Sequence, residues 1–381
     1  MGLLNKFGCL SIKLYFIICS IMAEIAYTTH HIIPHIISCM RERYMLGNYT
    51  SYEEGLFITN EVVFYTFPVI LTIGLVFSVI NSIITARMAT DSHECYLTAF
   101  NVASTILLIC CCVLHLPNYI KQDYSAYRRL LPYLPAVEAW CWQSCSWLLI
   151  TVTIERAAHS LCGKWHSSFG RVHGVLVSVL IVIICFVSTL PMYWEYDLDT
   201  VAYQDCGRIE LAPRVGVLEY QGGPYIMEYQ WFHWYQVIVG IGLPYLILPM
   251  LLPALVCIPM HIYTSSPRHM GTKVKYSIGS SMKERLRQER SFNRLICLMV
   301  VLYLIMSGPR NVLNLVRNPP IGMEITSDGL LLLTLMVAFD VIFYSFFTLL
   351  FFFYLTFGNK FRTALYQLCC CRKHQVIDYY N

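Results

Sequence analysis

Two carboxylates lie within apolar stretches of the chain, where each is placed to meet a positively charged group. Glu138 precedes Arg156 by eighteen residues, which is five turns at 3.6 residues per turn, so the two residues share one face of a helix. At 1.5 Å per residue they lie about 27 Å apart. Asp340 precedes Tyr354 by fourteen residues, nearly four turns, and shares the face of that residue. Both carboxylates are therefore predicted to point inward near the outer side of a helix bundle.

A pair of carboxylates in a cavity that opens outward would bind a ligand carrying an amine or a guanidinium group. Glu138 and Asp340 are therefore candidate ligand contacts, and Trp142, one turn after Glu138, is a candidate wall of the pocket. Two alternatives remain for the carboxylates, namely an ion pair with Arg310 or hydration in the vestibule. The alternative for Trp142 is the belt of aromatic rings that membrane proteins place at headgroup depth.

The chain carries none of the motifs that mark common enzymes, so no catalytic residue is predicted. It has no phosphate-binding loop, zinc-binding helix, pair of catalytic acids or nucleophile elbow. His30, His31 and His35 lie near Glu24 at a spacing that could bind a metal. This segment is predicted to be a tail or pro-region, so a metal site is not expected there. We therefore expect neither an enzyme, nor a metal or other cofactor, nor a nucleic-acid partner.

The composition places these residues in a membrane protein. Of the 381 residues, 57% are hydrophobic and 13% are charged, whereas soluble domains average about 45–50% and about 25%. A spanning helix needs about 20 mainly apolar residues. Seven segments meet this need, at about 61–86, 95–119, 136–160, 172–193, 234–262, 292–316 and 329–356. The predicted fold is an all-α integral membrane protein, a seven-transmembrane helix bundle over residues 61–356.

The two ends of the chain have different predicted roles. Lys6 and Lys13 precede a short apolar run at 15–23, and Ala23 and Ala26 follow it, which is typical of a secretory signal peptide over 1–26. The alternatives are an uncleaved first helix or a helix on the membrane surface. Residues 27–60 then form an extracellular tail, and residues 357–381 form a cytoplasmic tail.

Charge in the loops predicts the orientation. The segment 263–294, which ends at the third residue of the sixth span, holds eight Lys and Arg against two Glu, whereas the loop between the fourth and fifth spans holds seven acids against two Arg. Since basic loops stay on the cytoplasmic side, the N-terminus is predicted outside and the C-terminus inside. The glycosylation sequon at Asn48 agrees with an outside N-terminus. One outer loop disagrees with this orientation, because it carries Lys121, Arg128 and Arg129. The charges from Lys283 to Arg290 have helical spacing, so this run is expected to extend the sixth span into the cytosol. The basic segment is expected to contact anionic lipid, a cytoplasmic partner, or both.

Several motifs lie at matching positions in these spans. Glu155-Arg156 ends the third span, and Asn81 lies in the first. Tyr354 closes the seventh span before a short segment that opens Phe361-Arg362 and ends in Cys369, Cys370 and Cys371. This set resembles the rhodopsin-like (class A) G-protein-coupled receptors. The resemblance implies a switch at Glu155, Arg156, Pro309 and Tyr354, a membrane-surface amphipathic helix after the seventh span, and palmitoylation of the three cysteines. For Glu155 and Arg156, a purely local ion pair is the alternative.

Three further stretches narrow the resemblance. Tyr96-Leu97-Thr98-Ala99, the segment 147–156 and the segment 191–195 are similar to invertebrate FMRFamide-type neuropeptide receptors. The resemblance implies a plasma-membrane receptor that binds an extracellular RFamide-like peptide and activates a heterotrimeric G protein, with membrane lipids around it.

The sequence also departs from this family. Thr105 stands at the second-span Asp, Met306-Ser307-Gly308-Pro309 replaces the sixth-span Cys-Trp-x-Pro, and Leu350-Phe351 begins the segment that replaces Asn-Pro-x-x-Tyr. An atypical or G-protein-silent receptor is therefore an alternative. A transporter or channel is a second one, although polar residues are sparse through the spans and no internal repeat is seen.

The resemblance also implies a disulfide between the third span and the long outer loop. The loop supplies Cys206, but no cysteine occurs from residue 118 to 140, and Cys141 is expected to be buried. Either Cys39 bridges to Cys206 or Cys206 is free. Most of the 17 cysteines lie in apolar runs and are expected to fill space.

Overall fold

The computed structural model describes residues 51–115, 130–162, 170–194, 196–205, 208–217, 232, 234–264, 279–317 and 327–369. The predicted signal peptide, the sequon at Asn48, both cysteines of the predicted bridge (Cys39 and Cys206), and Cys370 and Cys371 lie outside these residues. Cys369 is the last residue of a helix.

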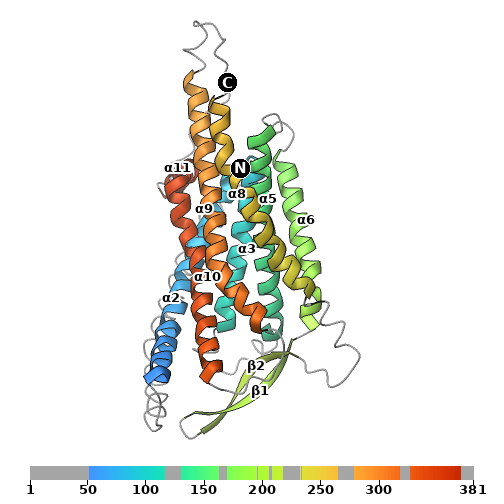
Figure 1. Cartoon of the computed structure of the whole chain (residues 1–381), viewed down its shortest axis with the longest axis vertical. Helices are drawn as coiled ribbons and strands as arrows, with labels where there is room; N and C mark the ends of the chain where they lie inside the picture. The colour runs from blue at the N-terminus through green and yellow to red at the C-terminus, as the bar shows by residue number, and fades with distance from the viewer. Residues whose placement is uncertain are drawn as a thin grey trace.

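Long helices form nearly all of the described chain (Figure 1). They are α2 (Ser51–Met88), α3 (Ser92–His115), α5 (Leu134–Cys162), α6 (Arg171–Thr189), α8 (Leu243–Thr264), α9 (Gly279–Arg317), α10 (Ser327–Phe357) and α11 (Asn359–Cys369). Short 3-10 turns, η2 (Leu131–Tyr133) and η4 (Leu190–Trp194), precede α5 and follow α6. A π-helical turn, η5 (Val237–Gly242), runs directly into α8.

Six of the described helices are long and apolar enough to cross a membrane, which indicates a multi-pass membrane protein. Their candidate spans are Thr66–Met88, Ser92–Val113, Arg171–Tyr193, Trp234–Leu255, Arg290–Leu313 and Ala338–Phe357. The predicted span at 136–160 is helical, as α5, but is not among the six. Polar and charged residues along α5 lower its hydropathy, and its side chains at Cys145, Leu148 and Thr153 are completely buried by other helices. The count of seven spans therefore stays a prediction.

The helices differ from the predicted spans mainly in length. Helix α2 begins at Ser51, so residues 51–60 of the predicted extracellular tail are helical. Helix α9 begins at Gly279, thirteen residues before the predicted span, and includes the basic run from Lys283 to Arg290. The helical spacing of the charges in this run predicts the extension of α9, and the structure confirms that the run is helical.

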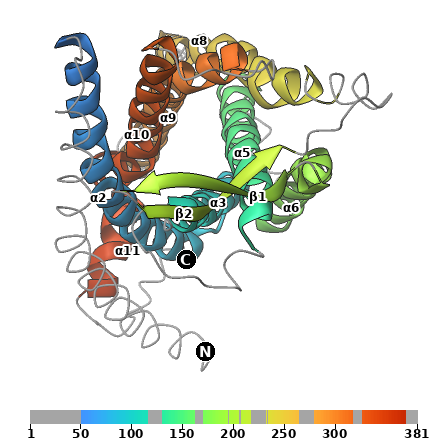
Figure 2. The ribbon, with the colours of Figure 1, turned by 90° about the horizontal axis from the view of Figure 1, so that it is seen from below.

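One β-hairpin interrupts the helical chain between α6 and η5. Strands β1 (Tyr196–Asp205) and β2 (Arg208–Val217) pair antiparallel, with Tyr196 opposite Val217 and Asp205 opposite Arg208. Seen along the bundle, the hairpin lies across one end of the ring of helices (Figure 2). We call this the hairpin end, and the opposite end the α11 end. This hairpin departs from the predicted all-α fold.

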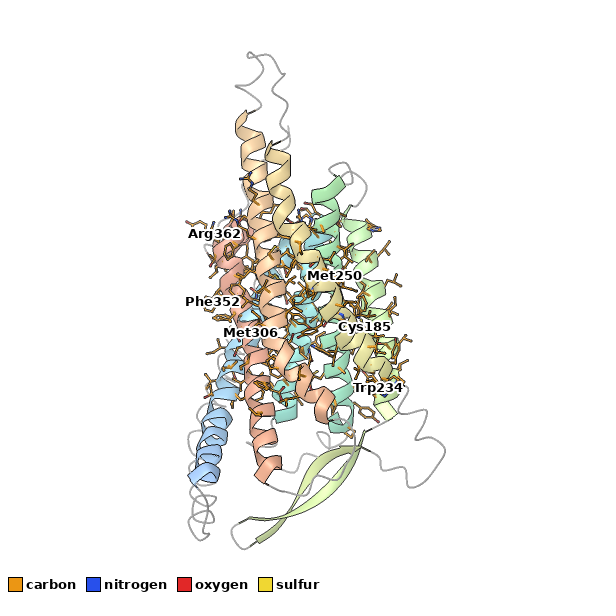
Figure 3. The ribbon with its side chains drawn as sticks, viewed as in Figure 1. Cys185, Trp234, Met250, Met306, Phe352 and Arg362 are labelled. Carbon is orange, nitrogen blue, oxygen red and sulfur yellow. The ribbon has the colours of Figure 1, made fainter. Side chains whose placement is uncertain are left out.

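Large apolar side chains are exposed on the outside of the candidate spans. On α6, large side chains are exposed along most of the helix, namely Val172, Val175, Leu176, Val179, Leu180, Ile183, Ile184 and Val187. Trp234 lies near the hairpin end and Arg362 near the α11 end, with Met250 and Phe352 between them (Figure 3). Since amphipathic and charged side chains prefer the edges of a bilayer, this order suits a membrane-embedded belt.

Candidate functional site

An arginine in α9 joins two carboxylates from two other helices. The Nη2 atom of Arg310 lies 2.5 Å from Oε1 of Glu138 in α5. Its Nε atom lies 2.6 Å from Oδ1 of Asp340 in α10. The side chains are only 16%, 18% and 26% exposed for Arg310, Glu138 and Asp340, respectively. We call these three residues the ion cluster.

Aromatic side chains of α10 complete the surroundings of Arg310. The hydroxyl of Tyr344 donates a 2.6 Å hydrogen bond to Oε1 of Glu138 and accepts one of 3.3 Å from Nη2 of Arg310. The guanidinium also lies over two rings, 4.6 Å from the centre of Phe343 and 5.2 Å from that of Tyr344. These rings interact favourably with the delocalised charge. Arg310 is therefore held on several sides by α5 and α10.

The ion cluster carries an excess of negative charge. Two carboxylates and one guanidinium give it a formal charge of −1. Desolvating such a cluster is costly, and apolar side chains of similar volume often stabilise a fold as well or better. An ion cluster inside an apolar bundle is therefore better explained by function than by stability.

The structure brings together the two carboxylates that helical spacing singled out. Glu138 and Asp340 meet through Arg310, so the ion pair that the sequence analysis held as an alternative is present. Sequence reasoning missed Tyr344 and the bridging role of Arg310. The sequence offers an indication for each residue. Arg310 is a charged residue in an apolar helix, and Tyr344 lies one turn after Asp340 on the same face.

Trp142 lies against the π-helical turn. A Cβ atom added to Gly240 of η5 would lie 3.5 Å from Cζ3 of Trp142, so the indole ring packs directly on that backbone. On α5, Trp142 is one turn from Glu138, as the sequence predicted. Its role as the wall of a ligand pocket stays a prediction.

The predicted switch residues at the α11 end contact two different helices. Oε1 of Glu155 accepts a hydrogen bond from the hydroxyl of Ser92, at the start of α3. The guanidinium of Arg156, which is 6% exposed, lies 4.2 Å from the ring centre of Phe292 in α9. The imidazole of His93 meets the same ring edge to face, 4.9 Å from centre to centre. Phe292 therefore connects the ends of α3, α5 and α9.

The other predicted switch residues lie in polar contacts within the bundle. The amide Nδ2 of Asn101 donates to the hydroxyl of Tyr354 at 3.2 Å. Two residues before Pro309, the hydroxyl of Ser307 is hydrogen-bonded to that of Tyr245 in α8. Pro309 thus lies in a helix that polar side chains join to its neighbour.

Helix α11 is fixed to the bundle by charge and by aromatic packing. Nζ of Lys360 lies 2.8 Å from Oε1 of Glu94, whose side chain is 5% exposed. The ring of Phe361, which is completely buried, stacks on Tyr354 with 5.2 Å between centres. One face of α11 is therefore buried, while Arg362, Thr363, Tyr366 and Gln367 are exposed.

One group of side chains at this end has the composition of a metal site. Ligand atoms of Asp91, His93 and Glu94 lie within 4.8 Å of one another. However, Oε1 of Glu94 contacts Lys360, and its Oε2 accepts hydrogen bonds of 2.8 Å from both the backbone N–H and the hydroxyl of Thr90. The carboxylate is engaged in fixing α11 and the start of α3, so we assign no metal there.

Comparisons of the sequence with protein-family models and with curated proteins found no match. The resemblance to the receptor family therefore depends on the motifs of the chain itself.

Proposed function

We propose that the chain is a rhodopsin-like G-protein-coupled receptor. It binds an extracellular ligand at the ion cluster and activates a heterotrimeric G protein at the α11 end. The observation that carries this proposal is the ion cluster, three charged residues from three helices within an apolar bundle. The receptor motifs quoted above support it.

The proposed orientation follows the charge of the loops. The hairpin end is extracellular and the α11 end is cytoplasmic, in the plasma membrane. Glycosylation at Asn48 and palmitoylation at Cys369, Cys370 and Cys371 belong to the same proposal. Helix α11 then lies at the membrane surface with its buried face toward the bundle.

The proposed ligand carries a positive charge, and an RFamide-like peptide meets this requirement through its arginine. Glu138 and Asp340 attract the cation, and Trp142 supplies an apolar surface nearby. Anionic ligands are disfavoured because the cluster already has excess negative charge.

Helix α9 connects the two ends of the proposed receptor. Arg310 and Phe292 are eighteen residues apart on it, which is five turns, so they share one face about 27 Å apart. A ligand that changes the contacts of Arg310 favours another position of α9, provided that it binds that position more tightly. Movement of α9 would separate Phe292 from Arg156 and open the cytoplasmic end.

Loss of Arg156 is expected to abolish the coupling. Arg156→Ala should reduce ligand-dependent nucleotide exchange by about tenfold or more, since hydrogen bonds from a charged group contribute about 1.5–3 kcal/mol. The measurement uses amidated peptides ending in Arg-Phe, the reconstituted receptor and a purified G protein. Ile154→Ala is the matched control, because Ile154 lies two residues away and is 47% exposed. Equal exchange by Arg156→Ala and the control would contradict the proposed role.

Loss of Phe292 is expected to raise nucleotide exchange, whereas loss of Arg156 lowers it. Phe292→Ala removes the ring under Arg156 and should raise ligand-independent exchange about 2- to 5-fold, as expected for a cation–π contact of about 0.5–1 kcal/mol. Phe292→Tyr keeps a ring and should restore the low basal rate. A basal rate that is unchanged in Phe292→Ala would show that this contact does not restrain α9.

Two outcomes would favour the alternatives. Peptide binding without exchange on any G protein would indicate a G-protein-silent receptor. Ligand-independent flux of ions or solutes through the purified protein in liposomes, without exchange, would indicate a channel or transporter.

A further inference from the structure

We infer that the two carboxylates of the ion cluster have different roles, and that the ligand binds by exchange at one of them. A single cationic group of the ligand replaces Arg310 at Asp340, while Arg310 stays with Glu138. Asp340 and Arg310 thereby determine the charge of the ligand. This inference rests on the proposed function and specifies how its site selects a ligand.

The first observation is how firmly Glu138 is held. Its Oε1 atom receives two hydrogen bonds, from Nη2 of Arg310 at 2.5 Å and from the hydroxyl of Tyr344 at 2.6 Å. A ligand cation would have to displace two donors that already contact each other. Glu138 therefore positions Arg310 and Tyr344.

The second observation is the exposure and geometry of Asp340. With 26% of its side chain exposed, Asp340 is the most accessible member of the cluster. It contacts Nε of Arg310, whereas Glu138 contacts Nη2, so the two carboxylates contact different nitrogen atoms of the guanidinium. The contact at Nε can be released while the contact at Nη2 stays.

The third observation is the charge balance. Before exchange the cluster has two carboxylates and one cation, and after exchange it has two of each. Arg310 keeps Glu138, Tyr344 and the ring of Phe343, so no charge is left in an apolar surrounding without a partner. One cationic group of the ligand balances the formal charge of these three residues, which is favourable in a medium of low dielectric.

Exchange at Asp340 would also act on the helices. The contact of Arg310 with Asp340 joins α9 to α10, and the contact with Glu138 joins α9 to α5. Replacing the first contact by a ligand releases α9 from Asp340 while α5 remains attached. The ligand thereby changes which helices Arg310 holds together.

Three probes of almost identical shape test the inference on the purified full-length protein. Benzamidinium, benzamide and benzoate carry charges of +1, 0 and −1 on the same ring. Thermal unfolding in detergent is followed while each probe is titrated, because a ligand that binds the folded state raises the melting temperature with its concentration. We expect benzamidinium alone to raise it.

Two matched variants locate the binding residue. Asp340→Asn should weaken benzamidinium binding about tenfold or more, as expected when a hydrogen bond to a charged group is lost. Ser345→Ala is the control on the same helix, since its hydroxyl donates to the carbonyl oxygen of Val341, in its own helix. Without any probe, Glu138→Gln should lower the melting temperature more than Asp340→Asn does.

Four results would overturn the inference. They are stronger binding of benzoate than of benzamidinium, benzamidinium binding that Asp340→Asn leaves unchanged, no binding of any probe up to its solubility, and a larger loss of stability in Asp340→Asn than in Glu138→Gln. Failure of the proposed function is distinguishable, because selective benzamidinium binding without nucleotide exchange would keep the inference and reject the receptor. Nucleotide exchange driven by an uncharged ligand would keep the receptor and reject the inference.

Discussion

Arg310→Met is expected to lower the free energy of unfolding by about 3–5 kcal/mol, the usual cost of removing one partner from a buried ion pair. Methionine keeps most of the length of the side chain but leaves Glu138 and Asp340 facing each other without the cation between them. The melting temperature of the purified protein in one detergent measures the loss. Arg171→Met is the control, since Arg171 is exposed, and it should change stability by no more than about 0.5 kcal/mol.

A triple variant separates charge from packing. Arg310→Met combined with Glu138→Gln and Asp340→Asn has no charged group in the cluster, so most of the lost stability should return. Arg310→Met alone and the triple variant share the same loss of stacking on Phe343 and Tyr344. If both were equally unstable, that stacking, and not the charge of Arg310, would be what stabilises the bundle.

Gly174→Ala is expected to lower the free energy of unfolding by about 1–3 kcal/mol, as overpacking does. A Cβ atom there would lie 2.6 Å from Cα and 2.8 Å from the carbonyl oxygen of Ser92, so helices α3 and α6 would have to separate. Rotation of a side chain cannot relieve a clash with backbone. Because Ser92 also donates to Glu155, the separation should disturb a predicted switch residue as well.

Gly170→Ala is the matched control for this effect. Gly170 immediately precedes α6, and an added Cβ atom would meet nothing within 4 Å. Alanine restricts the unfolded chain but is a poorer N-cap than glycine, so the two effects oppose each other and stability should change by no more than about 0.5 kcal/mol. Gly174→Ala should therefore lower the melting temperature clearly more than Gly170→Ala does. Equal shifts would contradict the close approach of α3 and α6.

Local helical periodicity explains what the sequence could predict of the candidate site. Spacing from Arg156 put Glu138 on the inner face of its helix, and spacing from Tyr354 did the same for Asp340. Both assignments needed only the pitch of an α-helix. Apolar run length likewise predicted seven spans, and six of them correspond to described helices that are long and apolar enough to cross a membrane.

Contacts between helices were beyond this reasoning. Phe292 is 136 residues from Arg156 along the chain, and no local pattern indicates that an aromatic ring lies under the guanidinium. The hydrogen bond from Tyr344 to Glu138 depends in the same way on how α5 and α10 are rotated about their axes. The charge of the loop does not indicate the hairpin, because the hairpin depends on the pairing of two separate segments of that loop.

The π-helical turn η5 has a consequence for variation in chain length. A π-turn closes each hydrogen bond over five residues instead of four, so η5 holds about one residue more than an α-helix of the same rise. Deleting one residue between Val237 and Gly242 can therefore be absorbed by a return to α-helical pitch. Only the residues before the turn, including Gln236 with its contact to the carbonyl oxygen of Ser188, would rotate, while α8 keeps its register against α9. Related chains that lack one residue here should thus retain the contact between Tyr245 and Ser307.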